Sequence, residues 1–340
     1  MTVTIKDVAE RAGVSTKTVS RVMNGEQHVR PAVREAVLRV VAELNYRPNA
    51  FARSLSSSRS YLLGAFFDDP TSGYAASVQH GALGRCRARS YHLVVEPIDL
   101  ASPDWERDLA ATIAALHLDG AILTPPLCEH RPLLERLMAL GLPFVRISPG
   151  EEVGPSGCLE MDEMGAAREM TEHLIALGHR DIGFVIGNPR HGGAPKRLRG
   201  FQDAMADAGL PVAKGRIVAG DYSFRSGFLA GEAMLSAPTR PTAIFASNDD
   251  MALGVSVAAM KLGIAVPDAL SIAGFDDAPT SRLAWPPITT IRQPVAEMAA
   301  AAVDMLADPA YRADLSASLY RRHLAHALIA RGSTAAVSVG

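Results

Sequence analysis

The stretch TIKDVAERAGVSTKTVSRVMN, residues 4–24, decides how this chain begins to fold. Thr4 followed three residues later by Asp7 is the pattern of a capping box, which starts a helix. Apolar residues then recur on one helical face, namely Ile5, Val8, Ala9 and Ala12. Gly13 breaks this helix, and Ser15 can cap a second one.

The second helix is short and amphipathic. Its inward-facing residues are Val19, Val22 and Met23, and the pair Asn24-Gly25 ends it. Two short helices joined by a tight glycine turn form a helix-turn-helix, in which the small Ala9 allows close packing. A third helix is predicted to start near Pro31, because proline suits a first helical position. Its apolar residues are Val33, Val37, Val40, Val41 and Leu44.

The segment NYRPNAFARSL (45–55) and the serine-rich SLSSSRS (54–60) follow the third helix. Pro48 disfavours helix at the residue before it, and Asn49 can cap a new helix over roughly residues 50–56. A helix of this length is not stable alone in water. We therefore predict a conditional hinge helix within an interdomain linker.

Charge is divided unevenly along the chain. Residues 1–59 contain ten Lys and Arg against five Asp and Glu, whereas the remainder contains 24 against 31. A basic head on a mildly acidic body indicates a head that meets a polyanion, although a solvated basic surface would give the same balance.

From Tyr61 onward, short apolar strands alternate with helical stretches. The strand segments include LLGAFF, HLVVEPI, GAILT, PFVRI, IGFVI, TAIFA and LSIAGF. This alternation is typical of βαβ units and parallel sheets. The predicted fold class is α/β: a three-helix helix-turn-helix headpiece with a hinge helix, then two Rossmann-like lobes. The predicted domains are a DNA-binding headpiece (1–47), a hinge and linker (48–60), a two-lobed effector-binding and dimerisation domain (61–334) and a tail (335–340).

Several classes of function lack their sequence signals. Cys86, Cys128 and Cys158 are scattered and show no metal-binding spacing, which favours a reducing compartment. We find no signal peptide, no membrane-spanning apolar run, and no nucleotide P-loop, GxSxG or HExxH motif. The expectation is a cytoplasmic protein with no membrane association, catalytic residue, metal or cofactor.

The exposed face of the second helix carries Thr16, Lys17, Ser20 and Arg21. The N-terminal end of such a helix typically points into the major groove, and the guanidinium of Arg21 can pair with guanine. The DNA-contact set also includes Ser15 and, placed for phosphates, Thr4, Thr18, Asn24, His28 and Arg30. The alternative is a three-helix bundle with an ordinary polar surface.

A two-lobed α/β body binds its ligand between the lobes, near the carboxyl ends of strands. The residues predicted there are Asp68, Tyr74, Ser148, Arg197, Tyr222, Asn248, Asp276 and Gln293. Carboxylate acceptors, an amide and an Arg donor suit the hydroxyl groups of a sugar, and Asp249 is a further acceptor. For Asp68, Asp69, Tyr74 and Gln293 a helix cap or surface position remains open.

Other residues near this region have competing interpretations. Asp249 and Asp277 could instead cap the helices that follow them. Lys196, Arg197 and Arg199 could receive an effector carboxylate or phosphate, whereas Lys196 and Arg199 could also form a solvated face. Trp285, beside Pro286-Pro287, is expected to pack near the crossover between the lobes.

The residues 4–24 together with VREAVLRVVAELNYRPNAFARSL closely resemble the headpiece and hinge of the lac repressor/gal repressor family. The resemblance continues through GHRDIGFVIG (178–187), FASNDDMALG (245–254), SIAGFDD (271–277) and PPITTIRQP (286–294), and ends near residue 334. It implies a homodimer on a near-palindromic double-stranded operator, with the hinge helices in the minor groove. Leu55 matches the family's wedging leucine, and the predicted hinge contacts are Asn49, Ala52, Arg53 and Leu55.

The resemblance also bears on the effector. It implies that Arg197, Asn248 and Asp276 contact a small molecule, with Tyr222 as an aromatic contact. Ser148 stands where sugar-binding members often have an aspartate, so no particular sugar is implied. Whether the effector acts as inducer or corepressor stays open.

We therefore predict a sequence-specific transcriptional repressor whose operator affinity a small molecule controls, most simply a sugar or sugar derivative. A transport or chemotaxis receptor shares such a body but needs export, and an α/β enzyme needs a nucleophile–base pair or metal cluster. A dimer is favoured over a tetramer because no C-terminal heptad repeat is found.

Overall fold

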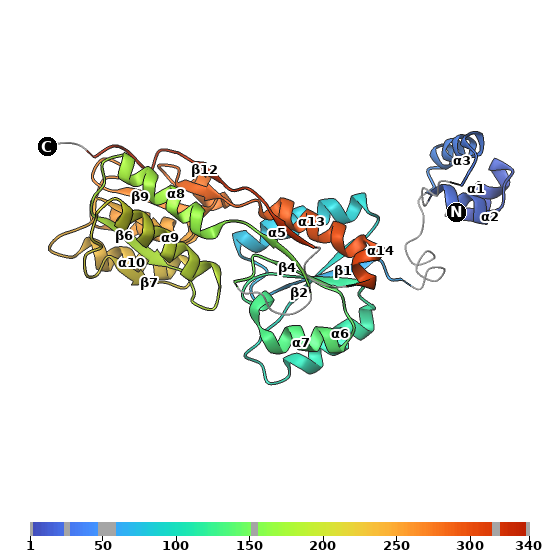
Figure 1. Cartoon of the computed structure of the whole chain (residues 1–340). Helices are drawn as coiled ribbons and strands as arrows, with labels where there is room; N and C mark the ends of the chain where they lie inside the picture. The colour runs from blue at the N-terminus through green and yellow to red at the C-terminus, as the bar shows by residue number, and fades with distance from the viewer. Residues whose placement is uncertain (1–2, 24–27, 47–58, 151–155, 315–319, 338–340) are drawn as a thin grey trace. The chain divides into compact units, whose positions relative to one another are not determined.

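The computed structural model describes residues 3–23, 28–46, 59–150, 156–314 and 320–337. The chain divides into two compact units, Met1–Tyr61 and Leu62–Gly340. Within the described residues, the first unit holds three helices and the second holds two α/β lobes (Figure 1). Asn24 and the predicted hinge residues Asn49, Ala52, Arg53 and Leu55 lie outside the described residues.

The first unit contains α1 (Ile5–Ala12), α2 (Thr16–Met23) and α3 (Pro31–Glu43). The Asp7 carboxylate accepts the backbone N–H of Thr4 at 2.7 Å, as a capping box requires. Gly13 ends α1 with a φ of 66°, a left-handed conformation that glycine adopts without strain. Ser15 Oγ accepts the N–H of Thr18 at 3.2 Å and so caps α2.

The three helices share one small core. Its buried members are Val8, Ala9, Val19, Val22, Val37 and Val40. This arrangement confirms the predicted helix-turn-helix and leaves the opposite, polar face of α2 available for contact.

The N-terminal lobe of the second unit is a six-stranded parallel sheet with the order β11-β5-β4-β3-β1-β2. Its strands are β1 (Leu62–Phe67), β2 (His92–Pro97), β3 (Gly120–Leu123), β4 (Phe144–Ile147), β5 (Gly157–Glu160) and β11 (Arg321–His323). Its helices are α5 (Gly73–Ala88), α6 (Trp105–Leu116), η1 (Leu127–Glu129), α7 (Arg131–Ala139), α13 (Val295–Ala307) and α14 (Pro309–Ala313). Helices α5 and α13 pack together on one side of the sheet, and α6 and α7 lie on the other (Figure 1).

The C-terminal lobe repeats this plan with the order β12-β10-β9-β8-β6-β7, in which only β12 pairs antiparallel among the described strands. Its strands are β6 (Ile182–Ile186), β7 (Ile217–Ala219), β8 (Ala243–Ala246), β9 (Ser271–Asp276), β10 (Thr289–Arg292) and β12 (Ala327–Ile329). Its helices are α8 (Glu163–Ala176), α9 (Gly193–Asp207), α10 (Phe224–Leu235), α11 (Asp249–Lys261) and α12 (Pro279–Leu283).

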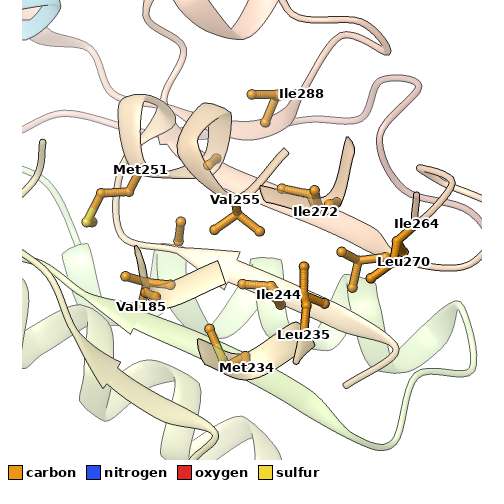
Figure 2. Close-up of a cluster of buried hydrophobic side chains, with 14 of the residues drawn as sticks. Val185, Met234, Leu235, Ile244, Met251, Val255, Ile264, Leu270, Ile272 and Ile288 are labelled. Atoms are coloured by element: carbon orange, nitrogen blue, oxygen red, sulfur yellow. The ribbon is translucent and has the colours of Figure 1, made fainter. Parts of the chain in front are cut away.

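Each lobe has its own apolar core. Figure 2 shows part of the C-terminal core, where Met251 and Val255 of α11 meet Val185, Ile244 and other strand residues. Burying an aliphatic side chain of this size contributes about 1.5–3 kcal/mol. The cores hold the strand ends, and therefore the loops that follow them, in fixed positions.

The chain passes between the lobes after β5, after β10 and between β11 and β12. Trp285 does not pack near these crossovers as expected, because 91% of it is exposed. The three cysteines are buried and free. Within the described residues, no helix combines the length and hydrophobicity needed to span a bilayer.

Candidate functional site

The polar face of α2 is one candidate site. Thr16, Lys17 and Arg21 are exposed and Ser20 is half-buried, because the buried Val19 and Val22 occupy the other face. The four polar residues follow helical spacing and share one side of the helix. This side is shaped to enter a groove of DNA, where hydroxyl, ammonium and guanidinium groups can reach base edges.

The residues predicted for phosphate contact surround this face in sequence. Thr4, Ser15, His28 and Arg30 are exposed and Thr18 is half-buried. Ser15 and Thr18 hydroxyl groups lie 3.0 Å apart, so part of their hydrogen-bonding capacity serves the cap of α2. The backbone N–H of Thr18 serves the same cap, and the N–H and hydroxyl of Thr4 both donate to the Asp7 carboxylate.

The second candidate site is a cavity of about 380 Å³ between the lobes of the second unit. All eight residues predicted for the effector line it: Asp68, Tyr74, Ser148, Arg197, Tyr222, Asn248, Asp276 and Gln293. The first three belong to the N-terminal lobe, the next four to the C-terminal lobe, and Gln293 to a crossover. Residues far apart in the sequence thus meet where the strands of both lobes end.

A buried charge network forms one wall of the cavity. Arg197 Nε donates to Glu163 Oε2 at 2.6 Å, and Arg197 Nη1 lies 3.8 Å from Asp276 Oδ1. Arg197 also donates to the carbonyl of Ser247 and stacks on the Phe275 ring at 3.7 Å. Burial lowers the pKa of Arg197, but the Glu163 charge, with smaller contributions from other neighbours, more than offsets it. Arg197 is therefore a fixed, charged group.

Asp276 stands beside this network. Burial raises its pKa to about 7, while Arg197 and a hydrogen bond from Gln293 act in the opposite direction. Gln293 Nε2 donates to Asp276 Oδ1 at 2.6 Å. Two partners therefore hold Asp276, both through the same carboxylate oxygen, Oδ1.

Two further polar atoms of the cavity lining are buried without hydrogen-bond partners among the described residues: Tyr74 Oη and Gln293 Oε1. A buried hydroxyl or amide oxygen without a partner costs about 1–3 kcal/mol. Burial also raises the pKa of Tyr74, which keeps its hydroxyl a proton donor. These atoms are where a bound molecule would gain hydrogen bonds.

Aromatic and imidazole rings form another wall. The ring centroids of Tyr222 and His191 lie 5.0 Å apart, and the Arg197 guanidinium carbon is 5.9 Å from the Tyr222 centroid. Burial, followed by the charge of Arg197, lowers the pKa of His191 to about 4, so the imidazole is neutral near pH 7. The two rings are tilted by 48° to each other and so present two apolar faces beside the charged Arg197.

The backbone at the site is held in unusual conformations. Ser148, Tyr222 and Asp276 have φ angles of 48°, 75° and 116°, a region that residues other than glycine rarely adopt. Such positions persist only where the surroundings fix them, and they cluster at functional sites. Asn248 is fixed differently: its Oδ1 caps α11 by accepting the N–H of Met251, and its Nδ2 donates to the Tyr222 carbonyl.

The lobes touch directly at one edge of the cleft. Glu129 Oε1 accepts the N–H of Gly150, in its own lobe, at 3.2 Å and the N–H of Gly192, in the other lobe, at 2.7 Å. A Cβ on Gly192 would lie 2.1 Å from the Cα of Gly150. Two glycines therefore allow a close approach of the two backbones that any side chain would prevent.

The expectations about Asp249 and Asp277 are resolved by their contacts. Asp249 is fully buried and does not line the cavity, because its carboxylate accepts the Ala278 N–H and the Thr290 hydroxyl. Asp277 likewise faces away and pairs with Arg282, Arg292 and Arg331.

The basic cluster does not face the cavity as a unit. Only Arg197 of the three lines it; Arg199 pairs with Asp203 on the surface, and Lys196 donates to the Pro149 carbonyl at 3.4 Å. Asp69 lines the cavity but also accepts the N–H of Thr71, so it stabilises its own turn.

Glu163 and His191 are two of the several lining residues that the sequence analysis missed; Asp221 and Asp250 are others. Glu163 begins α8 directly after the crossover from β5, and His191 lies in the glycine-rich loop before α9. Their positions at a strand end and in a loop before a helix were the available signals. Within the described residues, no cluster of His, Cys, Asp or Glu is arranged to hold a metal ion.

Two family models match parts of the chain. Residues 4–49 match the family model described as bacterial regulatory proteins, lacI family. Residues 171–334 match the model of the periplasmic binding protein-like domain.

Full-length relatives agree with these matches. The ribose operon repressor of Escherichia coli strain K12 is 34% identical over 306 residues, covering 89% of this chain and 92% of that protein. The lac repressor dimer bound to operator and the anti-inducer ONPF superposes with a TM-score of 0.75 at 29% identity, covering 99% and 100% of the two chains. The complex of the transcriptional regulator CelR with cellobiose gives 0.73 at 29% identity, covering 97% and 99%.

Proposed function

This chain belongs to the LacI family of bacterial regulatory proteins, and we propose on that basis that it is a homodimeric repressor of transcription in the cytoplasm. As a family member it is an effector-regulated DNA-binding protein and not an enzyme. The finer proposal is a near-palindromic operator and an effector that is a sugar or sugar derivative bound in the cleft.

The headpiece reads the operator. The exposed face of α2, with Thr16, Lys17, Ser20 and Arg21, enters the major groove of each half-site. Residues Thr4, Ser15, Thr18, Asn24, His28 and Arg30 contact phosphates and fix the register. Asn49, Ala52, Arg53 and Leu55 of the hinge contact the minor groove, where an inserted leucine kinks the DNA.

The cleft reads the effector. The observation that supports this most strongly is that eight residues selected from both lobes and a crossover line one cavity, in which Tyr74 Oη and Gln293 Oε1 lack partners among the described residues. A molecule that bonds to both lobes at once changes how they sit together. We propose that the predicted hinge helix forms only with DNA and its partner hinge, so that such a change alters operator affinity without contact to DNA.

Dimerisation needs a surface on the body. Exposed apolar side chains occur on α11 and at α12, two helices that pack against each other: Met260 is 71% exposed, Leu283 83% and Trp285 91%. Soluble proteins rarely leave a group of large apolar side chains open to water unless another molecule covers it. We assign a second copy of this chain as that molecule, as the lac repressor dimer also suggests.

Selection from a random duplex pool by the full-length protein tests the DNA proposal. We expect one near-palindromic sequence to be enriched, with two half-sites related by the same two-fold symmetry as the two protein subunits. Enrichment of no sequence, or of an asymmetric single site bound by one copy, would refute it.

Sedimentation tests the assembly. Trp285→Asp should shift the protein from dimer to monomer, because a charge replaces a large apolar anchor. Met138→Asp, at a side chain 36% exposed on α7, is the matched control and should remain dimeric. A Trp285→Asp protein that sediments as a dimer would place the interface elsewhere.

A further inference from the structure

We propose that Glu129 is a positioning residue that holds the two lobes of the body together: its carboxylate, carried by the N-terminal lobe, caps helix α9 of the C-terminal lobe. We call Glu129, Gly150 and Gly192 the clasp, because their contact joins the lobes at one edge of the cleft. The clasp itself does not depend on the proposed function. Its effect on operator binding rests on that function, which requires the lobes to control the headpiece.

Helix α9 begins without a cap of its own. Its N-cap residue is Gly192, which has no side chain, and its first turn contains no acidic residue. Helices α5, α10 and α11 also begin at the cleft, and each has a polar N-cap side chain that accepts a backbone N–H: Ser72, Ser223 and Asn248. The first N–H groups of a helix lack partners within it and carry partial positive charge. The start of α9 is therefore a place that a carboxylate from elsewhere in the protein can stabilise.

Glu129 supplies that carboxylate from the other lobe. Its Oε1 accepts the N–H of Gly192 at 2.7 Å and the N–H of Gly150, in its own lobe, at 3.2 Å. A hydrogen bond to an ionised acceptor is stronger than one between neutral groups. Glu129 is half-buried, so solvent and salt weaken this contact less than they weaken an exposed ion pair. One oxygen atom thus bonds to one backbone group of each lobe.

The turn that carries Glu129 is fixed in the N-terminal lobe. Glu129 ends η1, in which Leu127 and Cys128 are fully buried in the core of this lobe. The Glu129 N–H donates to the Pro126 carbonyl at 3.1 Å. The carboxylate therefore has a rigid support, and movement of α9 away from it breaks the bond to Gly192.

Two further contacts join the lobes at the same edge. A Cβ on Gly150 would lie 2.5 Å from the Gly192 Cα, so the two backbones touch where neither residue has a side chain. Lys196, in the first turn of α9, donates to the Pro149 carbonyl of the N-terminal lobe at 3.4 Å. All of these groups belong to the protein. The lobes are thus held at this edge by contacts that need no ligand atom.

The clasp also positions part of the cavity wall. His191 and Gly193, on either side of Gly192, both line the cavity, and so does Arg197, one turn further along α9. If the Gly192 N–H left Glu129, the start of α9 would move relative to the N-terminal lobe and carry these residues with it. Glu129 does not line the cavity itself. It therefore acts on the effector site through the position of α9.

Hydrogen exchange on the full-length protein tests the bond to Gly192. The Gly192 amide is followed in wild type and in Glu129→Ala by mass spectrometry with electron-transfer fragmentation. We expect this amide to exchange roughly 10- to 100-fold faster in Glu129→Ala, because the variant loses a hydrogen bond to a charged group. Glu135→Ala is the matched control, since Glu135 lies in the same lobe and pairs with Arg131 on the surface at 3.1 Å. The control should leave the exchange of Gly192 unchanged.

Two conservative variants separate charge from reach. Glu129→Gln keeps the length and an acceptor oxygen but loses the charge, whereas Glu129→Asp keeps the charge and is shorter by one methylene group. Because one oxygen must reach both Gly150 and Gly192, we expect Glu129→Gln to restore most of the slow exchange and Glu129→Asp to restore little. The reverse order would show that the start of α9 responds to charge alone, and the clasp would be wrong.

Distances between spin labels test whether the clasp holds the lobes. Met138→Cys on α7 and Leu229→Cys on α10 place one label on each lobe, at side chains 36% and 52% exposed. The three native cysteines are buried, so the labelling reagent reaches the introduced pair. Labelled protein is mixed with excess unlabelled protein so that most dimers carry at most one labelled copy. Wild type and Glu129→Gln should give one narrow distance distribution, and Glu129→Ala should add a second population.

Two outcomes would overturn the inference. If Gly192 exchanges at the wild-type rate in Glu129→Ala, the carboxylate does not cap α9. If exchange accelerates but the distance distribution stays as in wild type, Glu129 caps α9 locally and does not hold the lobes together.

Failure of this inference is distinguishable from failure of the proposed function. The operator affinities of wild type and Glu129→Ala are measured by fluorescence anisotropy on the selected duplex. If Glu129→Ala adds the second population but binds the duplex as tightly as wild type, the clasp is correct and the proposed control of the headpiece by the lobes is wrong. If the affinity for the duplex changes while exchange and distances do not, the clasp is wrong and the proposed function is not affected.

Discussion

The contact between Gly150 and Gly192 allows a substitution that acts on lobe closure alone. In Gly192→Ala, the new Cβ would lie 2.1 Å from the Gly150 Cα and 2.8 Å from its backbone nitrogen, more than an ångström short of ordinary contact for the first pair. Both nearest atoms are backbone, so no side chain can rotate away. The lobes must separate at this edge, and the Gly192 N–H must leave the Glu129 carboxylate that it now meets at 2.7 Å.

The cost follows from this overlap. Forcing an extra methyl group into a packed contact costs about 1–3 kcal/mol. Because each lobe keeps its own core, the free energy of unfolding should change little, and the cost falls on the arrangement with the lobes together. A coupling of that size is about 5- to 150-fold in affinity. We therefore expect Gly192→Ala to bind the effector weaker by this factor.

Calorimetry of the effector on wild type, Gly192→Ala and Gly84→Ala measures the effect. Gly84, in α5, is the control, since an added Cβ there would meet nothing within 4 Å and the residue does not line the cavity. Gly84→Ala should bind like wild type. Equal effector affinities in all three proteins would refute the idea that the cleft must close at Gly150 and Gly192.

Three further substitutions have expected outcomes. Arg21→Ala should weaken binding to the selected operator, measured by fluorescence anisotropy, by about 1–3 kcal/mol and reduce the base preference at one base pair. An equal loss of affinity for random DNA would show that Arg21 contacts only phosphate. Because burial raises the Asp276 pKa to about 7, the folded protein keeps a proton that the unfolded chain releases near pH 4, so this group's contribution to stability decreases as pH rises from 4 to 7. In wild type this decrease in the free energy of unfolding is on the order of 4 kcal/mol, and Asp276→Asn should abolish it in urea unfolding measured from pH 4 to 7. A variant whose free energy of unfolding depends on pH as it does in wild type would contradict the assignment. Glu163→Ala should lower the free energy of unfolding in urea by about 3–5 kcal/mol, because the nearest remaining carboxylate of buried Arg197 is that of Asp276 at 3.8 Å. Glu163→Gln keeps a hydrogen-bond acceptor and should lower the free energy of unfolding less. Equal losses of stability in the two variants would show that the ion pair does not contribute.

The headpiece was predictable because its signals are local. Asp7 lies three residues from the cap that it completes, and Gly13 ends α1 in the conformation that its lack of a side chain allows. The valines of the core repeat at helical spacing within single helices. No long-range contact had to be known.

The cleft was only partly predictable. The rule that ligands bind at strand ends selected Asp68, Asn248 and Asp276, because the carboxyl ends of parallel strands meet at one edge. The same rule does not say which way a side chain turns. Asp249 and Asp250 are adjacent at the start of α11, yet the first is buried against Ala278 and Thr290 while the second lines the cavity.

Pairing between residues on different helices could not be predicted from the sequence. Glu163 and Arg197 are separated by 34 residues and lie on different helices, so only the packing of α8 against α9 brings them together. Trp285 illustrates the opposite limit. A large aromatic residue beside two prolines suggests a packed position within one chain, but its 91% exposure is explained if a second copy covers it.

The central claim is that the cleft and the operator are coupled, and reciprocity tests it most directly. The affinity of the effector is measured for the free dimer and for the dimer on its selected operator, and operator affinity is measured with and without saturating effector. Linkage requires the two ratios to be equal, and we expect both to lie near 5- to 150-fold in the same direction. If the effector binds in the cleft but both affinity ratios equal one, the cleft and the operator are not coupled.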